Sequence, residues 1–93
     1  MVSNQNQKIG VIGAGAWGTA LSNILAKNHN IVLWAKEKKV CENINKHNEN
    51  KRFLPKIKLS KKIKCTTEMK DICNCDILFL VIPVQYLSGE LYK

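Results

Sequence analysis

Short apolar runs alternate with an amphipathic stretch in the first part of the 93-residue chain. Residues 8–12 form a β-branched run that stops at a cluster of glycines, and residues 31–34 form a second apolar run of strand length. Between them, apolar residues recur at the three- and four-residue spacing of one helix face: Trp17, Ala20, Leu21, Ile24 and Leu25. The pattern therefore predicts a strand, a helix that ends within residues 27–30, and a second strand that ends near Ala35.

The alternation continues through a second helix and a loop. Residues 38–48 carry apolar positions at helical spacing, at Val40, Cys41, Ile44 and His47. A polar stretch follows, and we expect residues 53–55, Phe-Leu-Pro, to anchor this loop to the core.

The last third of the chain predicts two more strands. Residues 63–66 have the composition of a short strand, and a turn of helix is expected around residues 68–73. Residues 76–83 are an unbroken apolar run closed by Pro83, which is typical of a strand buried in a parallel sheet. Strands that alternate with helices predict an α/β fold, a Rossmann-type doubly wound parallel sheet of about four strands.

Composition narrows the function classes. The net charge is +8, but fourteen of the fifteen basic residues are lysines and Arg52 is the only arginine, whereas proteins that recognise base edges rely on arginine. We therefore expect no nucleic-acid partner. The four cysteines form no CxxC pair, which predicts reduced thiols and no metal site. The longest apolar run is too short to span a membrane and the start lacks a secretory signal, so a cytoplasmic protein is expected.

The candidate chemistry lies in the glycine cluster. Residues 13–18, Gly-Ala-Gly-Ala-Trp-Gly, match the GxGxxG pattern and lie between a predicted strand and a predicted helix. Gly13 would permit the tight turn, Gly15 would let the backbone approach a pyrophosphate, and Gly18 would let the helix pack closely on the strand. Free N–H groups at the helix start would then bind phosphate. The motif in this context predicts a dinucleotide-binding site.

The end of the second strand bears on which nicotinamide cofactor is preferred. An acidic residue there bonds the ribose hydroxyls of NAD, whereas a basic residue accommodates the 2′-phosphate of NADP. Lys36 could pair with that phosphate, which favours NADP, and Glu37 could instead bond the ribose. The sequence therefore predicts NAD or NADP as cofactor and leaves the choice open.

Five segments together resemble the bacterial NAD(P)-dependent glycerol-3-phosphate dehydrogenases. The most discriminating are GAGAWGTALS at residues 13–22 and NENKRFLP at residues 48–55. The others are LWAK at 33–36, KLSKKIKCTTEMKD at 58–71 and DILFLVIPVQ at 76–85. The resemblance implies an enzyme that interconverts sn-glycerol 3-phosphate and dihydroxyacetone phosphate by hydride transfer, for phospholipid synthesis, and that could be a homodimer.

The resemblance also assigns residues to the cofactor. Besides the three glycines, Ala16, Trp17 and Lys36 fall where the family contacts NAD(P), although the family often has serine at position 16 and arginine or histidine at position 36. Phe53 and Tyr86 fall where aromatic residues line the cofactor cleft. The family's catalytic lysines and helical substrate domain lie beyond this chain. We therefore expect residues 1–93 to be a partial NAD(P)-binding Rossmann domain with no catalytic residue and no turnover of its own.

Two alternatives remain. A fragment of a 6-phosphogluconate-dehydrogenase-like reductase would share the glycine motif and the apolar strand that ends in proline. A noncatalytic nucleotide-binding or basic interaction module would account for the charge of +8. The tryptophan within the glycine motif and the NENKRFLP segment favour the glycerol-3-phosphate dehydrogenase family over both.

Overall fold

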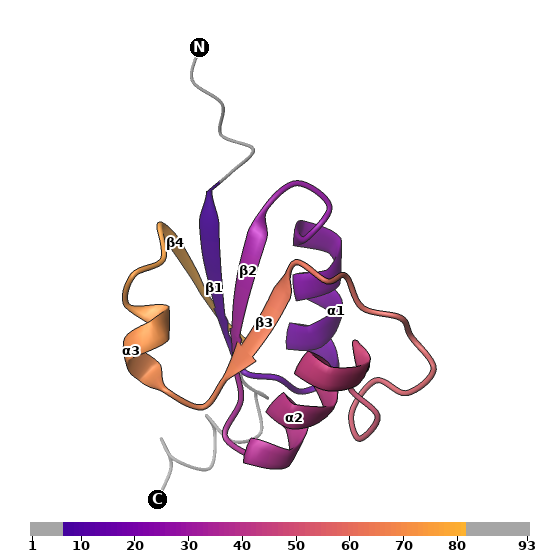
Figure 1. The fold of residues 1–93 in the computed structure, drawn as a ribbon. Coiled ribbons are helices and arrows are strands. Elements are labelled where there is room, and N and C mark those ends of the chain that lie inside the picture. The colour runs from indigo at the N-terminus through magenta and orange to yellow at the C-terminus, as the bar shows by residue number, and fades with distance from the viewer. Residues whose placement is uncertain (1–6, 82–93) are drawn as a thin grey trace, which may run out of the picture.

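Strands and helices alternate in the computed structural model, which describes residues 7–81 (Figure 1). The elements, in chain order, are β1 (Lys8–Ile12), α1 (Ala16–Leu25), β2 (Asn30–Trp34), α2 (Lys38–His47), β3 (Ile63–Thr66), α3 (Met69–Ile72) and β4 (Ile77–Leu80). The alternation predicted from the hydrophobic pattern is confirmed. The observed elements end within one or two residues of the predicted ones, except that α1 ends at Leu25, before the predicted range of 27–30, and that the last strand is shorter at its C-terminal end. Residues 82 and 83, which were predicted to complete that strand, lie outside the described residues.

All four strands are parallel and form one sheet in the order β3-β2-β1-β4. The chain runs outward from β1 through β2 to β3, and then returns to add β4 on the other side of β1. The strand order therefore reverses between β1 and β4, next to the carboxyl end of β1. In open parallel sheets such a topological switch point is where ligands bind.

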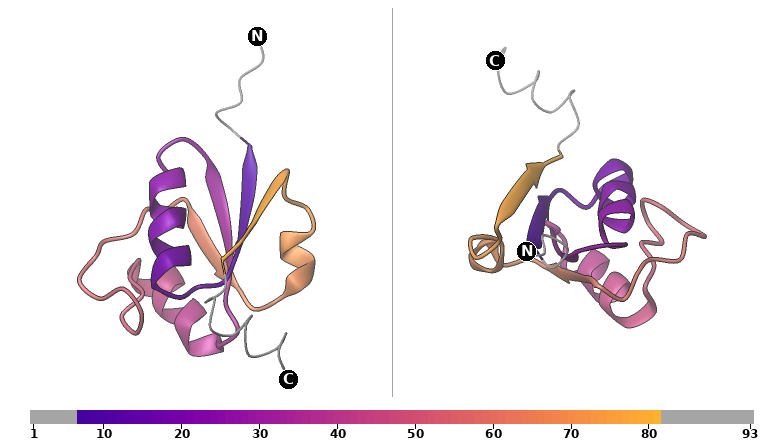
Figure 2. Two further views of the ribbon diagram at one scale, coloured as in Figure 1. Left: turned by 180° about the vertical axis from the view of Figure 1, so that it is seen from behind. Right: turned by 90° about the horizontal axis from the view of Figure 1, so that it is seen from above.

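Helices cover both faces of the sheet. Figure 2 shows α1 and α2 on one face and α3 on the other, so the predicted doubly wound α/β architecture is confirmed. The core lies between the sheet and the layer of α1 and α2. Its most deeply buried apolar residues include Val11, Leu33, Ile31 and Ile44.

The side of α1 that faces the sheet differs from the prediction. The apolar spacing pointed to a buried face that includes Trp17 and Ile24, but these side chains are 82% and 63% exposed. The buried residues of α1 are instead Gly18, Thr19 and Ser22. Small residues take this face because the helix approaches β1 closely, and the Ser22 hydroxyl is satisfied locally by donating to the Gly18 carbonyl at 2.8 Å.

The burial of β4 was also predicted wrongly. Its unbroken apolar run, Ile77 to Leu80, is between 37% and 65% exposed. Within residues 7–81, β4 pairs only with β1 and is the outermost strand of the sheet. An apolar run indicates that a strand is suited to burial, but it does not indicate the position of the strand in the sheet.

The loop between α2 and β3 is anchored by other residues than those predicted. Phe53 is 39% exposed and Pro55 is exposed, whereas Asn50 and Leu59 are 1% and 2% exposed. Leu59 supplies the apolar anchor, and its N–H donates to the Asn48 carbonyl at 2.8 Å. Asn50 supplies a polar anchor through bonds to the glycine loop. No helix within residues 7–81 has the length and apolar character needed to cross a lipid bilayer.

Two buried thiols meet between α2 and β3. The sulfurs of Cys41 and Cys65 are 2.9 Å apart, and both cysteines are free. Burial is the main cause that raises the pKa of Cys65, and the neighbouring Cys41 raises it further. The folded chain therefore holds the proton of Cys65 more tightly than the unfolded chain does.

We predict that Cys65→Ala removes an alkaline loss of stability. Below the ordinary thiol pKa of 9.0 both states keep the proton, and above it only the unfolded chain releases it, so rising pH lowers the free energy of unfolding. At pH 7 the variant should be about 1–2 kcal/mol less stable because a buried sulfur is lost. Urea titrations at pH 7, 9 and 10 should show this gap shrinking above pH 9. The exposed Cys73→Ala is the control, and a gap that does not change with pH would contradict the prediction.

Candidate functional site

Two of the three motif glycines are required by backbone packing. Gly13 has a φ of +118°, its N–H donates to the Trp34 carbonyl at 3.0 Å, and a Cβ built on it would lie 2.0 Å from the Val81 carbonyl oxygen. A Cβ on Gly18 would lie 1.7 Å from the carbonyl oxygen of Gly13. The turn after β1 and the start of α1 are therefore packed against each other and against the end of β4 with no space for a side chain.

Gly15 has the opposite environment. A Cβ on Gly15 would meet nothing within 4 Å, and its backbone is extended, with φ −75° and ψ −167°. It is the N-cap of α1, and no side chain caps the helix there. Within the described residues, the first helical N–H with a partner in the loop is that of Thr19, which donates to the Gly15 carbonyl at 3.0 Å. The N–H groups of the exposed residues Ala16 and Trp17 and the positive end of the helix dipole therefore lie beside the open space at Gly15.

Ala16 and Trp17 form the exposed rim of this space. Both lie in the first turn of α1 and both are exposed, Trp17 by 82%. Ala16 has no hydroxyl and contributes only its N–H. An indole this exposed at the start of the helix is not part of the core of the described residues.

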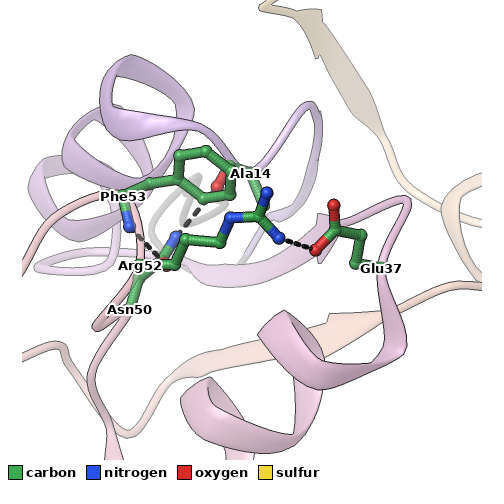
Figure 3. A network of polar contacts seen from close by, with 5 residues as sticks. All are labelled: Ala14, Glu37, Asn50, Arg52 and Phe53. Carbon is green, nitrogen blue, oxygen red and sulfur yellow. Dashed lines mark hydrogen bonds and ion pairs between the residues drawn. The ribbon is translucent and has the colours of Figure 1, made fainter.

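Asn50 fixes the glycine loop from the other side. Its side-chain amide nitrogen donates to the Ala14 carbonyl and to the Thr19 hydroxyl oxygen, both at 2.8 Å, and its side-chain oxygen accepts from the Phe53 N–H at 3.2 Å. Figure 3 shows the amide of Asn50 pointing at Ala14. Because Asn50 is 1% exposed, these bonds are shielded from water, and they join the glycine loop to the loop that follows α2.

The end of β2 forms a third part of the same edge. Lys36 is exposed, and Glu37 is the N-cap of α2. The Glu37 carboxylate pairs with the guanidinium of Arg52, which lies 5.0 Å from the centre of the Phe53 ring (Figure 3). Below this pair is a hollow of about 250 Å³ whose lining includes Glu37, Val40, Asn50 and Arg52. A larger hollow of about 420 Å³ lies beside β3 and is lined by none of the predicted site residues.

The structure brings most of the predicted residues to one edge of the sheet. Gly13, Gly15, Ala16, Trp17 and Gly18 share the turn into α1, and Phe53 is tied to that turn through Asn50. Lys36 follows β2 on the same edge but makes no hydrogen bond or ion pair within residues 7–81. Tyr86 lies outside the described residues.

Sequence reasoning missed Asn50 and Arg52. Both stand inside the NENKRFLP segment, which was singled out as a signature without a role for either residue. A polar residue within a polar stretch gives no hydrophobic signal, so its burial could not be expected. The one available signal for Arg52 was that it is the sole arginine among fifteen basic residues.

Comparisons with known proteins give one consistent result. The family model described as the N-terminus of NAD-dependent glycerol-3-phosphate dehydrogenase matches residues 8–93. The glycerol-3-phosphate dehydrogenase [NAD(P)+] of Parvibaculum lavamentivorans is 43% identical over 86 residues, which cover 91% of this chain and 26% of that protein. The enzyme of Maricaulis maris is 45% identical over 89 residues, which cover 95% of this chain and 27% of that one. The chain thus spans about a quarter of the length of these relatives.

Solved structures agree with the sequence matches. The structure of Plasmodium falciparum glycerol-3-phosphate dehydrogenase superposes with a TM-score of 0.77 and 28% identity, over 91% of this chain and 27% of that one. The glycerol-3-phosphate dehydrogenase of Coxiella burnetii superposes with the same TM-score, 0.77, and 28% identity, over 85% of this chain and 25% of that one.

We predict that substitution by alanine lowers the stability of the fold strongly at Gly13 and Gly18 but only slightly, if at all, at Gly15. Gly13→Ala and Gly18→Ala should lower the free energy of unfolding by roughly 3 kcal/mol or more, because each new Cβ meets a backbone carbonyl that cannot move aside. Gly15→Ala should change it by less than about 1 kcal/mol, since a smaller unfolded-state entropy offsets a poorer N-cap residue. Thermal and urea unfolding of the three variants measures this. Equal losses at all three positions would show that the space beside Gly15 is filled.

We also predict a large effect of Asn50→Asp. The substitution keeps the oxygen that accepts from Phe53 and removes both donors, so a carboxylate faces the Ala14 carbonyl. The free energy of unfolding should fall by about 2–4 kcal/mol in urea titrations. Asn43→Asp is the matched control, because the side-chain oxygen of Asn43 accepts from the Lys51 N–H and an aspartate preserves that bond. Similar losses in the two variants would argue against a special role of Asn50.

Proposed function

The chain belongs to the NAD-dependent glycerol-3-phosphate dehydrogenase family, as part of its N-terminal, NAD(P)-binding portion, and on this premise we propose that residues 13–18 bind the pyrophosphate of the cofactor. The observation that carries the proposal is the open space beside Gly15, next to the N–H groups of Ala16 and Trp17 and the positive end of the helix dipole. This is the one position in the motif where a ligand, and not the protein's own backbone, accounts for the glycine.

The remaining residues fit the rest of the dinucleotide. Ala16 and Trp17 donate backbone N–H groups and border the phosphates, and the exposed Lys36 at the end of β2 lies where the adenosine ribose is expected. Phe53, 39% exposed beside the glycine loop, offers an aromatic face to the adenosine half. Tyr86 is proposed for the same cleft on sequence grounds alone. The positive charge of Lys36 favours NADP over NAD.

The activity of the complete enzyme is part of the proposal. When bound, the nicotinamide ring supplies or accepts the hydride that interconverts sn-glycerol 3-phosphate and dihydroxyacetone phosphate. Residues 1–93 would form part of the NAD(P)-binding domain, and the substrate domain with the catalytic residues would belong to a longer chain. On this proposal the enzyme acts in the cytoplasm, serves glycerophospholipid synthesis, could be a homodimer, and the 93-residue chain binds cofactor without turnover.

The two alternatives have no support from the comparisons. The matching family model and the relatives are glycerol-3-phosphate dehydrogenases, and neither a 6-phosphogluconate-dehydrogenase-like reductase nor a basic interaction module appears among these relatives. The lysines that give the chain its charge of +8 are spread from Lys8 to Lys93, and no aromatic residues alternate with them as in a nucleic-acid-binding surface.

The proposal is tested by titrating the full 93-residue chain with NADPH and with NADH. We expect saturable quenching of tryptophan fluorescence, since Trp17 borders the site, together with thermal stabilisation that reaches about 2.7 kcal/mol at a hundredfold excess over Kd. Gly15→Val should fold normally and lose binding at least about a hundredfold, because its side chain occupies the space that the pyrophosphate needs. Binding by Gly15→Val that equals that of the wild type would refute the assignment of the glycine loop.

A further inference from the structure

We propose that Arg52 determines cofactor specificity: its ion pair with Glu37 allows the site to accept the 2′-phosphate of NADPH as well as the free ribose of NADH. This inference rests on the proposed function and extends it to a residue outside the glycine motif and outside β2.

Glu37 stands where an acidic side chain normally selects NAD. It follows the carboxyl end of β2 by three residues and caps α2, so its carboxylate lies at the edge of the sheet that carries the glycine loop. A carboxylate there accepts hydrogen bonds from ribose hydroxyls and repels a 2′-phosphate. An unpaired Glu37 would therefore oppose the attraction of Lys36 for a 2′-phosphate.

Arg52 neutralises this carboxylate. Its guanidinium reaches Glu37 from the loop after α2 (Figure 3). The Arg52–Glu37 contact is the only ion pair within residues 7–81. The guanidinium also lies 5.0 Å from the centre of the Phe53 ring, and this cation–π contact restricts the orientation of the guanidinium. The loop that carries both residues is fixed at Asn50 by buried hydrogen bonds to the glycine loop. The backbone of the loop at Arg52 is therefore held near the proposed pyrophosphate site, while its guanidinium stays exposed.

The pair is suited to exchange partners. The side chains of Arg52 and Glu37 are 61% and 45% exposed, and pairs as exposed as this contribute little to stability. A guanidinium has five N–H donors in a planar fork, so Arg52 can bind a phosphate oxygen with one edge while the other edge still faces Glu37. Lys36, a single exposed ammonium, offers attraction to phosphate but cannot neutralise Glu37 in this way.

The hollow beside the pair gives the ligand a place. It has a volume of about 250 Å³ and is lined by Glu37, Lys39, Val40, Asn43, Asn50 and Arg52. A ribose at this position would meet the Glu37 carboxylate, and a 2′-phosphate would meet the Arg52 guanidinium. Glu37 would thus bind the ribose of NADH, and Arg52 would bind the 2′-phosphate of NADPH.

The test is a set of NADPH and NADH dissociation constants, measured by tryptophan fluorescence on the full 93-residue chain. Arg52→Gln should weaken NADPH binding about tenfold or more and change NADH binding by less than about threefold, because it removes a charged donor and exposes Glu37. Glu37→Gln should weaken NADH binding and strengthen NADPH binding relative to it. The double variant should lie closer to the wild type in its NADPH to NADH ratio than Arg52→Gln does, because the uncompensated carboxylate is gone.

Lys51→Gln is the matched control. It removes the same charge one position earlier from an exposed residue that makes no ion pair within the described part of the chain, so it should change both constants equally and slightly. Thermal unfolding without ligand confirms that each variant is folded. An unchanged NADPH to NADH ratio in Arg52→Gln, in a chain that binds both nucleotides, would overturn the role of Arg52 and leave the proposed function intact. A folded wild-type chain that binds neither nucleotide would overturn the proposed function and this inference with it.

Discussion

The close approach of α1 to the end of β1 is the constraint on which the site depends. The backbone of the turn at Gly13 and the backbone of the helix at Gly18 are in direct contact, with no space for a side chain between them. This contact holds the start of the helix against the end of β1, with the exposed Ala16 and Trp17 in its first turn. It also decides which face of α1 is buried, because only small side chains such as those of Thr19 and Ser22 fit beneath a helix held so near to a strand.

The second requirement is that the turn keep its shape without a helix-capping side chain. Asn50 meets it from a loop that is 36 residues further along the chain than Ala14. The side chain of Asn50 is buried, so its hydrogen bonds are shielded from water. Removing one of them would leave a buried polar group without a partner, which lowers the stability of the fold. Through Phe53 and Arg52 the same loop also reaches the end of β2. One loop therefore supports both the glycine loop and the end of β2, the two parts of the proposed cofactor site.

Local sequence patterns were sufficient for the fold but not for the faces of its elements. The glycine motif between residues 8–12 and 31–34 predicted the strand, helix and strand correctly, because the spacing of apolar residues and the position of glycines act within a few residues. The apolar spacing of α1 failed to identify its buried face, since Trp17 and Ile24 are exposed and the contact with β1 selects by size and not by hydropathy. The exposure of β4 depended on the strand order, and the burial of Asn50 depended on partners 31 and 36 residues away. Such long-range facts leave no trace in a local pattern.

The sequence separation between Asn50 and Ala14 affects the order in which the chain folds. Closing a contact across 36 residues costs more chain entropy than forming the adjacent strand and helix, so the segment from β1 to β2 can assemble before residue 50 is in place. On a ribosome, residues 8–34 emerge well ahead of it. We therefore expect a nascent chain to form its βαβ unit first and to fix the conformation of the glycine loop only later, after Asn50 has been translated.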